Sequence, residues 1–253
     1  MTETVAADRA GRDATRLIRR GPLEWLAAGV LGLLLLRLLW SLVTNENLIW
    51  GTVVDHLFHP DVLAGVWLTV RLTALVVLVA SAIGLIVARL VRSGNPVLSG
   101  IARAYVWVFG SIPVLVQLLL WSNIALVFPD LGFGIPGVHI DAVRQVTPVY
   151  AAIAGLGLAM GAYAARVIGR DDAAAGRLVD RLGEVLVVTL QATSLVSVLS
   201  ITDLLGVVQA LEERNHLIIP LLTVAAIWYL VLVTAARGAI RLIGWASGRR
   251  EAP

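Results

Sequence analysis

The stretch LAGVWLTVRLTALVVLVASAIGLIVARLV, residues 63–91, decides the fold class of this chain. It is longer than the roughly 20 apolar residues with which a helix crosses a bilayer, and it holds only two charged side chains, Arg71 and Arg89. Five more stretches of this kind lie along the chain, at residues 22–43, 105–128, 148–168, 184–201 and 217–243. The sequence therefore predicts an all-α fold, a polytopic membrane helix bundle of about six transmembrane helices.

The composition agrees with this prediction and excludes several functions. Of the 253 residues, 58% are hydrophobic and 15% charged, whereas a soluble domain is about half apolar and a quarter charged. Cysteine is absent, which excludes a disulfide framework, a thiolate zinc site and a cysteine nucleophile. All 20 basic residues are arginine, which excludes a phosphate-loop ATPase motif, a Schiff base and a Ser-Lys hydrolase. We therefore expect neither an enzyme nor a cofactor site.

The placement of the arginines predicts the orientation. The N-terminal tail, the segments after residues 91 and 168, and the C-terminal end carry most of them, whereas the loops on the other side carry only Arg144 and Arg214. Because positive residues stay on the cytoplasmic side, both termini are predicted to lie in the cytoplasm. We attribute the basic tail, residues 1–21, to topology and attraction to anionic lipid rather than to nucleic-acid binding.

The external segment after the first span could imitate a metal site. His56 and His59 lie near Asp55 and Asp61, but no third histidine is close in sequence. We favour a short interfacial helix over a zinc site and predict no metal.

Small residues at intervals of four predict close helix packing in two spans. Ala80, Gly84 and Ala88 form such a stripe in one span, as do glycines 157 and 161 with Ala165 in another. Such stripes let helix backbones approach, so they indicate a bundle and carry no chemistry.

Polar side chains inside two spans are the candidates for a solute path. In residues 184–201, hydroxyl side chains recur every three or four residues around Thr193 and Ser194, and Asp203 follows at the outer end. In residues 105–128, Ser111 and Gln117 flank Pro113, which should loosen the helix and free a carbonyl. Hydrogen bonding between helices and the wall of a pathway both explain such a pattern. Two polar spans favour transport over a simple anchor.

Four strings, in this order along the chain, resemble the permease subunits of polar amino acid ABC importers of the histidine/glutamine/arginine/opine type. They are GVWLTVRLTAL (65–75), YVWVFGSIPVLVQLLLW (105–121), TPVYAAIAGLGLAMGAYAARV (147–167) and TSLVSVLSITDLLG (193–206).

The resemblance implies a type I importer fold in a bacterial inner membrane, with a permease-like domain at residues 62–243. Residues 22–61 would hold the first span and an external segment, and residues 1–21 and 244–253 cytoplasmic tails. The implied partners are a second permease, separate ABC ATPases and an extracytoplasmic solute-binding protein.

The chain departs from the family at the coupling loop and at three polar positions. Only residues 169–181 remain of a long cytoplasmic loop, and DDAAAGRLVDRLG (171–183) lacks the spacing of the family's EAA motif. The family usually carries charge where Gly110 and Gln191 stand, and an acidic residue where Arg166 stands. Such changes tend to occur together, because a charge left alone in the membrane is costly. We therefore expect a degenerate half that pairs with a complete permease.

Two other functions remain open, a non-transporting accessory subunit of a transporter and an ATP-independent channel or carrier. If a pathway exists, its predicted residues are Ser111, Gln117, Thr193, Ser194 and Asp203. Arg170, Arg177 and Arg181 are predicted to contact a cytoplasmic subunit, with lipid headgroups as the alternative.

Overall fold

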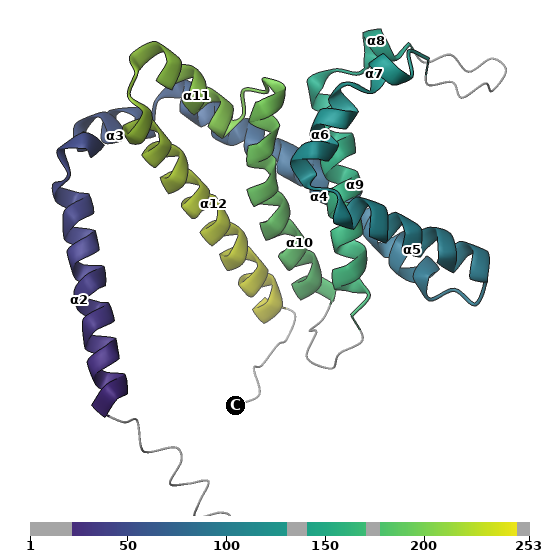
Figure 1. Cartoon of the computed structure of the whole chain (residues 1–253), viewed down its shortest axis with the longest axis horizontal. Helices are drawn as coiled ribbons and strands as arrows, with labels where there is room; N and C mark the ends of the chain where they lie inside the picture. Colours follow the sequence, from purple (N-terminus) through teal and green to yellow (C-terminus); the bar gives the residue numbers. More distant parts are fainter. Residues whose placement is uncertain (1–21, 131–140, 171–177, 247–253) are drawn as a thin grey trace, which may run out of the picture. The chain divides into compact units, whose positions relative to one another are not determined.

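The computed structural model describes residues 22–130, 141–170 and 178–246. Helices form nearly all of this described part, and its only β pairing is an isolated bridge between Asp130 and Asp141. The chain divides into two compact units, Met1–Ile49 and Trp50–Pro253. Five of the described helices are long and apolar enough to cross a membrane, and a bent pair makes a sixth candidate span (Figure 1).

The first unit contains helix α2 (Pro22–Thr44) and the short 3-10 helix η1 (Glu46–Leu48). Leucine and other apolar side chains cover α2 all round and are exposed, from Trp25 to Val43. A helix that is apolar on every side belongs in lipid or in a protein core. The predicted first span is therefore confirmed as a helix of nearly the predicted length.

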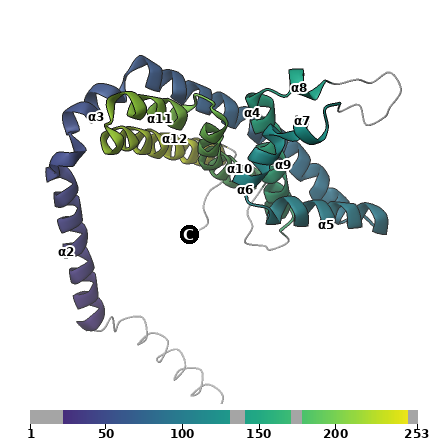
Figure 2. The same cartoon turned by 45° about the horizontal axis from the view of Figure 1, so that its top comes forward.

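The second unit is built around two helices that run side by side in the same direction, α4 (Pro60–Val91) and α9 (Pro148–Ile168) (Figures 1 and 2). A Cβ atom added at Gly84 would lie 2.5 Å from the Ala164 Cβ atom, and one at Gly157 would lie 2.9 Å from Val79. Only glycine fits such close approaches. Both predicted stripes of small residues are thus used within this chain.

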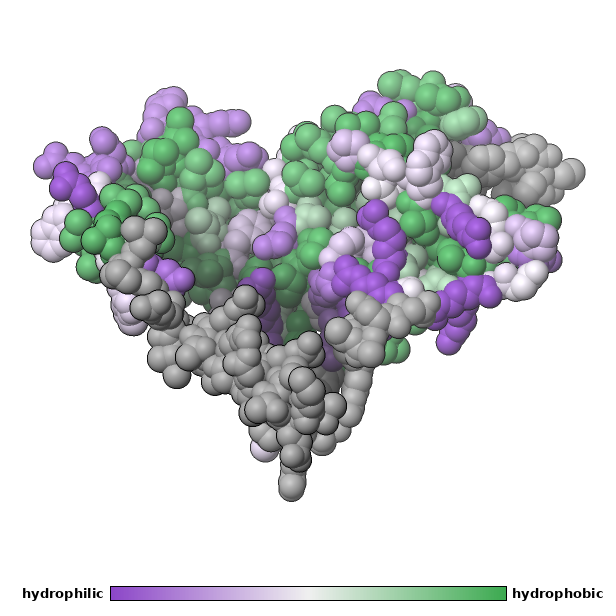
Figure 3. Space-filling view, turned by 60° about the horizontal axis from the view of Figure 1, so that its bottom comes forward, coloured by the Kyte–Doolittle hydropathy of each residue, from purple (hydrophilic) through white to green (hydrophobic). Residues whose placement is uncertain are grey.

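The two largest apolar clusters of the described residues lie in the core of this unit. Leu72 and Val76 of α4 pack with Leu156 of α9 and Leu118, which belongs to helix α6 (Val114–Ser122). A second cluster joins α3 (Trp50–Leu57), α4, α11 (Leu204–Asn215) and α12 (Ile218–Ala246). Much of the surface drawn in Figure 3 is also hydrophobic, and its hydrophilic residues gather in patches. An apolar exterior around an apolar core is expected of a protein whose solvent is lipid.

The third predicted span, residues 105–128, is wrong as a single helix. Helix α5 (Pro96–Ser111) already begins at Pro96 and meets α6 at an angle of 99°. Pro113 has no amide hydrogen, and the residue before it, Ile112, is extended (φ −76°, ψ 127°), as proline requires. The short helices α7 (Ile124–Val127) and α8 (Ala142–Gln145) follow. Pro113 therefore breaks this span rather than loosening it.

The fifth span also differs from its prediction. Helix α10 (Leu178–Ala192) begins before residue 184 and continues as a 3-10 helix, η2 (Thr193–Leu199). The 3-10 helix η2 ends at Ser200, whose φ of 58° is left-handed, and α11 and α12 follow. Because a 3-10 helix has three residues per turn, the hydroxyl residues after Ala192 do not continue the α-helical face that their spacing suggested.

Candidate functional site

A buried polar cluster joins four elements of the second unit. Thr69 and Thr73 lie one turn apart on α4 and are 0% and 3% exposed. The Thr73 hydroxyl lies 3.4 Å from that of Thr193, while the Thr69 hydroxyl accepts a hydrogen bond from the Leu204 amide at 3.0 Å. Hydroxyls of α4 thus face the junction between η2 and α11. The sequence pattern of span 63–91 contained these two threonines, but they were not predicted as site residues.

Asp203 lies in this cluster and is fully buried rather than open to an outer mouth. Its Oδ1 atom accepts a hydrogen bond from the Gly206 amide at 3.0 Å and so caps the N-terminus of α11. Its Oδ2 atom accepts one from the Tyr229 hydroxyl at 3.3 Å. Burial raises the pKa of Asp203 to about 6 despite these bonds. Tyr229 is a further polar residue of this cluster that was not predicted.

The predicted hydroxyl residues of η2 bond to their own backbone. Thr193 donates to the Leu190 carbonyl at 2.6 Å, and Ser194 donates to the Gln191 carbonyl at 2.8 Å. Each bond reaches back three residues. It gives a hydrogen-bond donor to a backbone carbonyl at the point where the α-helix changes to a 3-10 helix. The hydroxyls therefore stabilise the end of α10, and only Thr193 also faces α4.

Gln117 and Ser111 lie at the break between α5 and α6. The Gln117 side chain is 2% exposed, and its Nε2 atom donates to the Phe109 and Ile112 carbonyls, both at 2.9 Å. Phe109 is the residue whose carbonyl an amide at position 113 would normally bind, so Gln117 replaces the donor that Pro113 lacks. The Oε1 atom of Gln117 has no partner among the described residues. Ser111 is exposed beside a cavity.

The structure thus divides the five predicted pathway residues into two groups. Thr193, Ser194 and Asp203 lie at the junction of α10, η2 and α11, whereas Ser111 and Gln117 lie at the break in the third span. Within the described part of the chain, no hydrogen bond joins the two groups.

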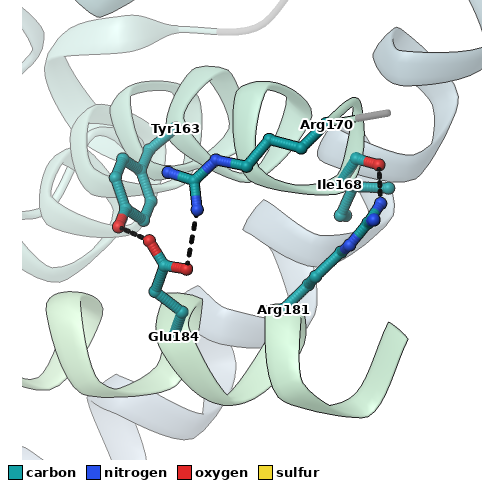
Figure 4. A network of polar contacts seen from close by, with 5 residues as sticks. All are labelled: Tyr163, Ile168, Arg170, Arg181 and Glu184. Carbon is teal, nitrogen blue, oxygen red and sulfur yellow. Dashed lines mark hydrogen bonds and ion pairs between the residues drawn. The ribbon is translucent and has the colours of Figure 1, made fainter. Parts of the chain in front are cut away.

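Two of the three predicted contact arginines, Arg170 and Arg181, form bonds between the ends of α9 and α10 (Figure 4). Glu184 of α10 accepts from the Tyr163 hydroxyl at 2.6 Å and from Arg170 at 3.1 Å. Arg181 donates to the Ile168 carbonyl at 2.6 Å. Arg177 lies outside the described residues. Arg170 and Arg181 therefore hold together α9 and α10, the two helices on either side of residues 169–177.

Gly110 and Arg166 face each other. A Cβ atom at Gly110 would lie 3.2 Å from the Arg166 Cζ atom, so the guanidinium group lies over the glycine. A second arginine at position 110 would meet this charge directly. Gln191 is exposed elsewhere, beside Arg237 and Arg241.

No family model matches the sequence. Over 244 residues the chain is 27% identical to the arginine transport system permease protein ArgU of Corynebacterium glutamicum, covering 85% of this chain and 77% of ArgU. This chain is homologous to amino acid transport permeases. A solved structure, described as an amino acid ABC transporter with histidines, shares the fold with a TM-score of 0.60 and 22% identity, over 74% of this chain and 94% of that one. The chain is thus a multi-pass protein of the bacterial inner membrane.

Proposed function

We propose that this chain is a permease subunit of an ABC importer for polar amino acids, with both termini in the cytoplasm. The observation that carries the proposal is the agreement between its homology to an arginine permease and its fold, which matches nearly all of an amino acid ABC transporter chain. ATP hydrolysis would belong to a separate ATPase. A solute-binding protein would deliver the amino acid from outside.

The polar cluster and the helix break are the proposed parts of the pathway. Separation of α4 from η2 would expose the Thr73 and Thr193 hydroxyls and bring Asp203 closer to solvent. At the break, the Gln117 Oε1 atom keeps an unused acceptor that an ammonium or guanidinium group of a solute could meet. Ser111 and Ser194 are retained as flanking contacts. A purely structural role for these side chains is the alternative.

The chain would form a degenerate half of a heterodimer with a complete second permease. Residues 169–181 leave little length for a docking helix, and Arg170 and Arg181 already bond within the chain. Any contact of Arg170, Arg177 or Arg181 with an ATPase would therefore add to these bonds. The complete partner would supply most of the coupling.

The test is amino-acid-dependent ATP hydrolysis in membranes that contain the ATPase with this chain, with a complete permease, or with both. We expect stimulation by arginine only when both permeases are present. Full stimulation with this chain as the sole permease would contradict the degenerate half, and no stimulation in any combination would contradict the importer.

A second candidate is an accessory subunit that does not transport. The hydroxyls of Thr193 and Ser194 favour this function, because they bond to the backbone of their own helix and do not face an open path. Thr193→Val and Gln117→Met distinguish the two functions, because only a pathway residue should change which amino acid is taken up. Unchanged solute preference together with altered transporter abundance would favour the accessory function.

A further inference from the structure

An arginine-lined cavity lies where α4 and α9 end beside α5, and of its lining the proposed function uses only Ser111. Its volume is 370 Å³, which is within the range of small-molecule sites. Arg92, Arg103 and Arg166 line it, one from each of three separate segments. None of the described residues that line it is acidic.

Three guanidinium groups bring positive charge to this arginine cavity. Arg92 donates to the Gly169 carbonyl at 3.0 Å, which holds it at the end of α9. Arg166 lies against Gly110, whose missing side chain leaves room for the guanidinium group. In the described part of the chain, no carboxylate lies within ion-pair distance of Arg103 or Arg166. The cavity therefore favours an anion.

The remaining walls favour an anion that carries an apolar chain. Ala88, Val91, Val106 and Ala165 contribute apolar lining. Trp107 extends from the cavity to the surface and is 72% exposed. Basic pockets between spans bind anionic lipid headgroups, and an exposed tryptophan offers an acyl chain a large apolar ring. A free phosphate would leave the apolar wall and Trp107 unused.

We propose that this arginine cavity binds one anionic phospholipid, with the headgroup phosphate between Arg103 and Arg166 and an acyl chain along Trp107. The proposal requires only that the chain spans a membrane, and it is independent of the solute transported. Arg166 stands where the family that this sequence resembles usually carries an acidic residue. Bound lipid would offset the positive charge that Arg166 brings to the cavity.

The test is titration of the full-length chain in non-ionic detergent with short-chain phosphatidylglycerol, with bound lipid counted by native mass spectrometry. We expect the double variant R103Q/R166Q to bind about thirty-fold more weakly, the equivalent of about 1 kcal/mol for each arginine near a membrane surface. The matched control R237Q/R241Q removes the same charge from α12 and should change binding less than about three-fold. Equal losses in the two variants would overturn the site.

A second measurement does not depend on the folding of the arginine variants. Phosphatidylglycerol with a brominated acyl chain should quench tryptophan fluorescence of the unmodified chain, and W107F should lose that part of the quenching. Unchanged quenching in W107F would overturn the placement of the acyl chain.

Four further comparisons exclude other occupants. Equal binding of phosphatidylcholine, or equally tight binding of glycerol 3-phosphate, would overturn an anionic lipid site. Lipid binding that appears only in D171N/D172N would show that the chain's own carboxylates fill the cavity. Loss of a co-purifying ATPase in R103Q/R166Q, with lipid binding unchanged, would assign the cavity to a protein partner.

Discussion

Replacement of Gln117 tests how the broken span is held. Gln117→Met keeps the length of the side chain but removes both donors to the Phe109 and Ile112 carbonyls. Hydrogen bonds between helices in membranes average about 0.6 kcal/mol, and buried ones in soluble proteins about 1 kcal/mol. Two lost bonds should therefore lower the free energy of unfolding by about 1–2 kcal/mol.

The assay is unfolding in mixed micelles, followed by far-UV circular dichroism. Gln191→Met is the matched control, because that side chain is exposed and should change the free energy by less than about 0.5 kcal/mol. In a Pro113→Ala background the amide of residue 113 can bind the Phe109 carbonyl, so the cost of Gln117→Met should fall by about half. An equal cost in both backgrounds would refute the argument that Gln117 replaces the missing donor.

Three further predictions concern the polar cluster and the helix packing. Asp203→Asn retains an acceptor for the Gly206 amide and should keep the stability that the protonated carboxyl gives at low pH, whereas Asp203→Ala should lose about 1–3 kcal/mol in the same unfolding assay. Because the folded pKa of Asp203, about 6, exceeds the ordinary aspartate value of 3.8, its protonation should stabilise the fold fully below pH 3.8. That stability should be lost as the pH rises through 6. Asp203→Asn should remove this dependence of the free energy of unfolding on pH. Gly84→Leu should destabilise by at least about 1–3 kcal/mol through a clash with Ala164, whereas Gly100→Leu, where nothing lies within 4 Å of an added Cβ, should be tolerated. A stable Gly84→Leu variant would contradict the α4–α9 contact.

The hydropathy pattern predicted the helical spans, because a bilayer selects apolar length and little else. The predicted span at residues 148–168 coincides with α9. The bent span was harder to place, because apolar composition continues through Pro113 without interruption. Hydropathy measures length along the chain and carries no information on the 99° change of direction.

The candidate site was less predictable, because it depends on which helix type a residue adopts. The spacing of Thr193, Ser194 and Ser197 predicts one polar face only if these residues continue an α-helix. They lie in a 3-10 helix instead. Asp203 was expected to be open at the end of a span, whereas its capping role at α11 depends on a turn that begins at Ser200. The structure brings Gly110 and Arg166 face to face, and the prediction that the two positions change together stays a prediction.

The bond from Gln117 to the Phe109 carbonyl has an evolutionary consequence. Pro113 and Gln117 form a compensated pair, in which the proline removes a donor and the glutamine supplies one. A lineage that lost the glutamine first would pass through a less stable intermediate, whereas one that lost the proline first would not. Sequences related to this chain should therefore contain the glutamine without the proline more often than the proline without a donor one turn later.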